Sequence, residues 1–178
     1  MAKIKIKLDE GAVMPTRAHS SDVGYDVKCL EFYLVSRFGD KTRIYDKNHL
    51  DLALSRVSTV HHVEIDTGVH VQPEDGYYVE LVPNSRIGKT QLIYGNSFGV
   101  IDPEYTGSMK VMLNCVSECW LRDDLGKFLP NNVVGQLIVR KKLDAEFTVV
   151  DELDTTVRGD GGFGSTEKPV LGSEDWFS

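Results

Sequence analysis

The chain has 178 residues, of which 41% are apolar and 26% are charged, and its formal net charge is −7. These values predict one globular domain, or at most two small ones, and exclude a disordered chain. No apolar run approaches the roughly 18 residues that a membrane-spanning helix needs, and the negative charge disfavours a surface for duplex DNA or an anionic membrane. Three cysteines are too few, and odd in number, for a disulfide framework, so we expect a reducing, cytoplasmic setting.

Alternation of apolar and polar residues dominates the chain and predicts β-strands. It begins at residues 4–8, where isoleucine and leucine alternate with lysine. The first ten residues lack the apolar run that a signal peptide needs, so no signal peptide is expected. The best helix pattern covers residues 48–55, which Asn48 could cap. Further strands are predicted within residues 57–71 with a break near 66–68, and at 77–82, 109–115, 133–139 and 147–150. Many short strands between Gly, Pro, Asn and Asp turns indicate an antiparallel sandwich or barrel.

Glycine is concentrated in residues 158–166, near the C-terminus. Gly159, Gly161 and Gly164 have the spacing of a dinucleotide fingerprint, but that motif needs a following helix and an acid about 20 residues further on. Only 14 residues follow Gly164, so this interpretation fails. A glycine-rich segment with hydroxyl groups and an arginine can wrap a phosphate, and it can equally be a flexible tail.

Three other short stretches contain polar residues next to predicted strands. They are residues 20–26, 83–86 and 99–107. Each alone is explained by a turn, and Asp102 is of a type that commonly forms turns.

The order of these stretches resembles the five motifs of the trimeric dUTPases. The resemblance covers residues 18–166, and the third and fifth motifs are the most specific matches. The motifs fall at residues 22–27, 83–89, 96–107, 135–138 and 158–166.

The resemblance implies an all-β, jelly-roll-like β-barrel that assembles as a homotrimer. Residues 1–157 would form the catalytic barrel, and residues 158–178 would form an arm that closes a neighbour's active site. A segment at about residues 29–59 is longer than the usual connection, and its mixed charges suggest a surface insertion. The implied activity is hydrolysis of dUTP to dUMP and pyrophosphate, which limits uracil incorporation into DNA and supplies dUMP for dTTP synthesis.

The resemblance also implies a role for each motif residue. Asp102 would be the catalytic base that holds the attacking water, and Asp26 would hold Mg²⁺ through water. The substrate-binding residues would be Ser85, Arg86, Asn96, Gly99, Tyr105, Gln136, Arg158, Gly162, Phe163, Ser165 and Thr166. No direct contact with nucleic acid or a membrane is expected.

The sequence departs from the family at some positively charged positions. Asn84 stands where the second motif usually has arginine, and Val133 stands where the fourth usually has arginine. Arg86 could replace the lost charge by reaching over Ser85. The lost charges leave open a non-catalytic or regulatory protein of the same fold, and the shared barrel leaves open a relative of the dCTP deaminases.

Overall fold

The computed structural model describes residues 2–56, 60–116 and 121–161, and these fall into two units. The first compact unit ends at Leu143, and the second begins at Asp144. Among the described residues, none of the helices combines the length and the apolar character needed to cross a membrane.

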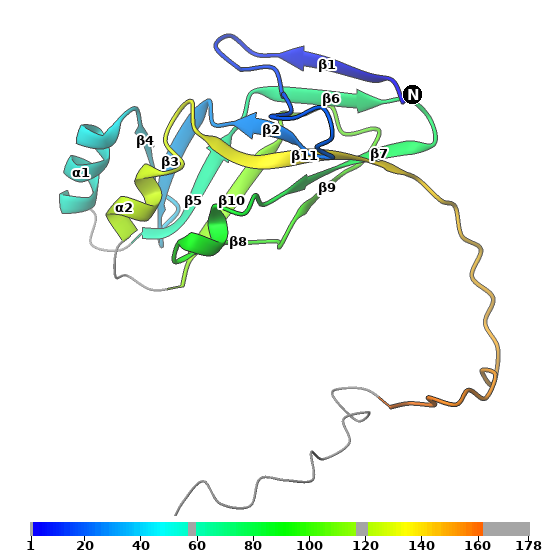
Figure 1. Cartoon of the computed structure of the whole chain (residues 1–178). Coiled ribbons are helices and arrows are strands. Elements are labelled where there is room, and N and C mark those ends of the chain that lie inside the picture. Colours follow the sequence, from blue (N-terminus) through cyan, green and yellow to red (C-terminus); the bar gives the residue numbers. More distant parts are fainter. Residues whose placement is uncertain (1, 57–59, 117–120, 162–178) are drawn as a thin grey trace, which may run out of the picture. The chain divides into compact units, whose positions relative to one another are not determined.

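The first unit is built mainly of antiparallel β-strands, which confirms the expected all-β class (Figure 1). A two-stranded sheet pairs β1 (Ile4–Leu8) with β6 (Val69–Pro73). A five-stranded sheet has the order β4 (Lys41–Ile44), β3 (Glu31–Ser36), β5 (Val60–Asp66), β10 (Lys110–Cys115) and β8 (Leu92–Tyr94). A four-stranded sheet has the order β2 (Tyr25–Lys28), β11 (Val133–Lys141), β7 (Tyr77–Val82) and β9 (Gly99–Ile101).

The core lies between the sheets, and alternation along the strands supplies it. In β3, Phe32 and Leu34 are buried, and in β7, Val79 and Leu81 are buried, as expected when every second side chain faces inward. The buried Tyr94 of β8 donates a hydrogen bond from its hydroxyl to the carbonyl oxygen of Val134 in β11. This bond links the five-stranded and four-stranded sheets close to the fourth motif.

The helices lie together at one end of the sheets (Figure 1). They are α1 (Lys47–Arg56) and α2 (Leu121–Gly126), joined by an ion pair between Arg122 Nε and Asp51 Oδ1 at 3.2 Å. A short 3₁₀ helix, η1 (Ile87–Lys89), follows β7.

The predicted helix at 48–55 is confirmed within α1, but the predicted cap is wrong. The side chain of Asp46, rather than Asn48, accepts the backbone N–H of His49 at 2.8 Å. Asp46 precedes the helix and its short carboxylate can reach back to the first turn, which is the usual capping geometry.

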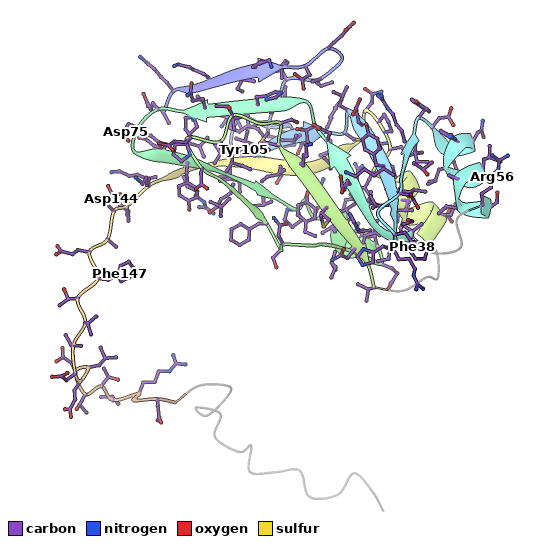
Figure 2. The ribbon with its side chains drawn as sticks, turned by 180° about the vertical axis from the view of Figure 1, so that it is seen from behind. Phe38, Arg56, Asp75, Tyr105, Asp144 and Phe147 are labelled. Atoms are coloured by element: carbon purple, nitrogen blue, oxygen red, sulfur yellow. The ribbon has the colours of Figure 1, made fainter. Side chains whose placement is uncertain are left out.

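The predicted strand at residues 147–150 is also wrong. The structure gives no strand there, and Phe147 and Val149 are 92% and 98% exposed on an extended stretch (Figure 2). An alternating pattern can form a strand only where another strand is available to pair with it, and the described part of the chain offers none to this segment.

The segment at residues 29–59 contributes to the core as well as to the surface. It contains β3, which pairs with β5 along its length, and it buries Phe32, Ile44 and Leu50. Its charged residues remain at the surface, where Arg43 Nη2 pairs with Glu31 Oε1 at 2.7 Å.

Candidate active site

The first and fourth motifs meet in neighbouring strands of the four-stranded sheet. Asp26 in β2 lies directly opposite Gln136 in β11, and the Gln136 amide donates from Nε2 to Asp26 Oδ1 at 2.9 Å. Gly24 makes this contact possible, because a Cβ at residue 24 would lie only 2.9 Å from Gln136 Oε1 and 3.0 Å from Gln136 Cβ. The two side chains are therefore placed by strand register together with a close backbone approach.

The second motif begins where β7 ends, next to the same pair. Val82 lies opposite Gln136, and the chain then turns through Asn84, whose Oδ1 accepts the backbone N–H of Arg86 at 3.1 Å. Such an asparagine bond mimics a backbone turn and stabilises it locally. Ser85 is exposed in this turn.

Arg86 is held against the loop that follows α2. Its Nη1 donates to the carbonyl oxygen of Lys127 at 3.3 Å, while the side chain stays exposed. A guanidinium has five N–H donors, so this single bond leaves donors for an anion.

The beginning of β9 completes this end of the sheet. Gly99 pairs with Leu81, next to the Val82–Gln136 pair. Asn96 precedes this strand beside a cavity of about 440 Å³, which is lined by Glu64, Gly95, Asn96, Lys110, Val111 and Met112. A cavity of this size lies in the range of small-molecule sites.

Residues 102–107 form a turn at the other end of β9. The backbone N–H of Tyr105 donates to the Asp102 carbonyl oxygen at 3.0 Å, and the Tyr105 hydroxyl donates to the Ser108 carbonyl oxygen at 3.0 Å. A side chain at Gly107 would overlap the Tyr105 ring, so this glycine lets the ring lie close to the backbone. The ring is 45% exposed and the Asp102 side chain is also exposed, so both can meet a ligand.

Asp102 and Gln136 lie at different levels of the sheet. Ile101 pairs with Val79, so Asp102 is level with Tyr78, whereas Gln136 is level with Val82. Four residues of strand separate these levels, which is about 13 Å at roughly 3.3 Å per residue. One chain therefore brings Asp26, Ser85 and Gln136 to one end of the sheet and leaves Asp102 at the other.

The structure also shows an anchor for the 102–107 turn that the sequence analysis missed. His70 in β6 bonds through Nδ1 to the Thr106 carbonyl oxygen at 2.8 Å and through Nε2 to Asp9 Oδ2 at 3.0 Å. Both partners are acceptors, so the arrangement favours the protonated ring, which donates from both nitrogens. The bond with Asp9, and then the Thr106 carbonyl, raise the pKa of His70 above its ordinary value, and the pKa of Asp9 is lowered chiefly by the same bond. No local pattern links residues 9, 70 and 106.

The predicted fifth motif is only partly within the described residues. Arg158 is exposed, and its Nε donates to the Gly161 carbonyl oxygen at 2.8 Å. Gly162, Phe163, Ser165 and Thr166 lie outside the described residues. Their roles stay predictions.

The oxygen donors at Asp26 suit a magnesium ion that is bound by few protein ligands. Gln136 occupies Asp26 Oδ1, which leaves Oδ2 as a hard oxygen donor. Across the described residues, no three His, Cys, Asp or Glu side chains gather into a cage. Magnesium commonly uses one or two carboxylates together with water and substrate phosphates, so a single carboxylate with a free oxygen is a suitable protein ligand for it.

Comparisons with known proteins show which proteins this chain is similar to. A family model described as dUTPase matches residues 47–167. The chain is 32% identical over 165 residues to a deoxyuridine 5'-triphosphate nucleotidohydrolase of Escherichia phage T5, covering 92% of this chain and 97% of the relative. It is 32% identical over 160 residues to a protein of the same name from Solanum lycopersicum, covering 90% of this chain and 78% of the relative. A solved structure of the dUTPase from Staphylococcus bacteriophage 80alpha, with dUPNHPP, superposes with a TM-score of 0.68 at 22% identity and covers 93% of this chain and 99% of that one.

Proposed function

This chain belongs to the dUTPase family, and we propose that it hydrolyses dUTP to dUMP and pyrophosphate. One observation carries the proposal: Asp26, Gln136 and the turn that presents Ser85 meet at one end of the four-stranded sheet. A carboxylate, an amide and a hydroxyl together suit a metal-associated polyphosphate.

The reaction needs a base for its attacking water, and Asp102 is our candidate. Water is a poor nucleophile, and a positioned carboxylate that takes its proton typically contributes about 10²–10⁴-fold in rate. The exposed Asp102 carboxylate, on a turn closed by the Tyr105 N–H, can hold a water against the α-phosphorus and can itself contact the sugar 3′-hydroxyl.

Recognition of the nucleoside is assigned to β9 and the two turns that flank it. The Tyr105 ring, fixed by its bond to Ser108 and by its approach to Gly107, would lie against the deoxyribose and leave no room for a 2′-hydroxyl. Asn96 and the backbone around Gly99 would read the edge of the uracil, and the narrow turn would exclude a 5-methyl group.

Recognition of the phosphates is assigned to the other end of the sheet. Ser85 would donate to the bridging region between the α- and β-phosphates, where charge develops as pyrophosphate leaves. Gln136 and Arg86 would donate to the phosphate oxygens. Bound magnesium would neutralise phosphate charge, with Asp26 as its protein partner through water.

The separation of Asp102 from Ser85 and Gln136 supports a homotrimer in which different copies complete each site. A triphosphate must reach the base and the phosphate donors at once, and one chain holds them about 13 Å apart along the strands. Residues 158–178 would act as an arm over a neighbouring site, with Arg158, Gly162, Phe163, Ser165 and Thr166 in contact with substrate.

One assay tests the function. The purified protein is incubated with Mg²⁺ and either dUTP or dCTP, and the release of pyrophosphate and of deaminated product is measured. We expect pyrophosphate and dUMP from dUTP only, and the Asp102→Asn variant should lose most of this turnover while keeping its fold. Deamination of dCTP would instead identify a deaminase, and binding of dUTP without turnover would identify a non-catalytic relative.

A further inference from the structure

An ion pair with a buried carboxylate connects α2 to the turn that carries Ser85 and Arg86. Asp124 is only 5% exposed, and its two carboxylate oxygens have different partners. Oδ2 accepts the backbone N–H of Gln91 at 2.7 Å, and Oδ1 accepts Lys127 Nζ at 2.8 Å. A buried carboxylate is costly unless it is fully bonded, so this one must have a fixed position.

Lys127 extends the connection to two more points of the turn. Its Nζ also donates to the Lys89 carbonyl oxygen at 3.2 Å, and its own carbonyl oxygen accepts Arg86 Nη1 at 3.3 Å. Residues 86, 89 and 91 are thus all bonded to Asp124 or Lys127. The bonds to Lys89 and Gln91 satisfy backbone groups that follow β7 and lie outside its pairing with β11.

The charge state of the pair agrees with this geometry. Burial disfavours the charged form of Asp124, but the bonds from Lys127 and from the Gln91 N–H outweigh it, so the pKa of the carboxyl is lowered. The carboxylate is therefore charged at neutral pH and holds both donors.

We propose that Asp124 and Lys127 are positioning residues that orient the turn bearing Ser85 and Arg86 toward the phosphates of the substrate. This rests on the proposed function, because it assigns phosphate recognition to that turn. Asn84 at the position before Ser85 cannot form a charged, two-pronged phosphate contact. Fixing Arg86 through the Lys127 carbonyl holds a guanidinium on the turn that carries Ser85 and lowers the entropy that Arg86 loses on binding an anion.

The test compares two probes on the full-length protein, inorganic tripolyphosphate and deoxyuridine, by calorimetric titration. Asp124→Asn keeps the side-chain shape, but its amide N–H₂ must face either the Gln91 N–H or the Lys127 ammonium group. Both of these are donors, so one bond to the turn is lost. We expect an affinity for tripolyphosphate about 10-fold lower and an unchanged affinity for deoxyuridine. The parent protein's turnover of dUTP is measured separately, so a failure of the proposed function is seen on its own.

Further variants separate positioning from general stability. Lys127→Arg keeps donors for both Asp124 and Lys89 and should restore the parent affinity, whereas Lys127→Met should behave like Asp124→Asn. Lys127 is 39% exposed in its side chain, so its replacement should leave the protein folded. Glu31→Gln, which breaks the Arg43 pair between β3 and β4, is the matched control and should change neither affinity.

Three further results decide the proposal. If the pair acts through Arg86, Asp124→Asn should cause no further loss in an Arg86→Ala background. Equal affinities for tripolyphosphate in the parent and in Lys127→Met would overturn the proposal. So would parallel losses for both probes, because these would mean that the pair only supports the fold.

Discussion

Replacing Gly24 with alanine should damage the phosphate end of the site through a single methyl group. The added Cβ would lie 2.9 Å from Gln136 Oε1, which can swing away, but also 3.0 Å from Gln136 Cβ, which is fixed to β11. Either β2 or β11 must shift, and the amide must leave Asp26 Oδ1, to which it now donates at 2.9 Å.

The expected loss of stability and of activity follows from the overpacking and from the displaced Gln136 amide. Overpacking of this kind typically costs about 1–3 kcal/mol of unfolding free energy. The loss of a Gln136 bond to a charged phosphate removes about 1.5–3 kcal/mol of binding in the transition state. At 1.36 kcal/mol per tenfold, kcat/KM for dUTP should fall by about 10- to 150-fold.

The assay is pyrophosphate release, together with chemical denaturation to measure stability. Gly88→Ala is the matched control, because nothing lies within 4 Å of a Cβ at that position, and it should leave kcat/KM unchanged. The double variant Gly24→Ala/Gln136→Ala should be no less active than Gln136→Ala alone. Parent-like activity in Gly24→Ala, or losses that multiply in the double variant, would refute the reasoning.

Three other predictions concern different parts of the chain. Arg86→Ala should weaken dUTP binding by about 1.5–3 kcal/mol and leave deoxyuridine binding unchanged, and equal dUTP affinities by titration would remove Arg86 from phosphate recognition. Deletion of residues 158–178 should leave a folded trimer with little turnover, because the compact unit ends at Leu143, and dissociation on sizing would contradict this. The raised pKa of His70 means that its bonds to Asp9 and Thr106 stabilise the fold fully below its ordinary pKa of 6.5, and that this contribution disappears as pH rises through the raised value. The stability difference between the parent and His70→Gln, measured by denaturation, should therefore shrink from pH 6 to pH 9, and a difference that grows would contradict it.

Much of the barrel could be predicted from alternation alone. The patterns at 77–82, 109–115 and 133–139 correspond to β7, β10 and β11, and the break at 66–68 separates β5 from β6. These strands each bury one face, so their sequences carry a period of two. The pattern at 147–150 has the same period but forms no strand. Periodicity shows that a segment could be a strand, but it does not show whether a neighbouring strand is available to pair with it.

The site was only partly predictable for a related reason. Motif resemblance supplied Asp26 and Gln136 one at a time, but their contact depends on the register of two strands 110 residues apart. The bonds of His70 with Thr106 and of Asp124 with Gln91 span 36 and 33 residues, and no local signal indicates them. Such contacts are set by tertiary packing, which orders residues without a repeating pattern.

The arrangement of β7 and β9 makes the division of the site testable by mixing inactive subunits. Because β9 runs antiparallel to β7, the residue that ends β9 lies far from the residue that ends β7, so we expect Asp102 and Gln136 of one chain to serve different sites. Asp102→Asn removes the base from every site, and Gln136→Ala removes a phosphate donor from every site. A homotrimer of either variant should therefore be nearly inactive. In trimers re-formed from equal amounts of both variants, a site is intact when its Asp102 comes from one variant and its Gln136 from the other, which is about one quarter of the sites. Activity of mixed trimers near a quarter of the parent's is therefore expected. If mixing restores no activity although mass spectrometry shows mixed trimers, both residues serve the same site from one chain. The separation of Asp102 and Gln136 along the strands would then have no functional meaning.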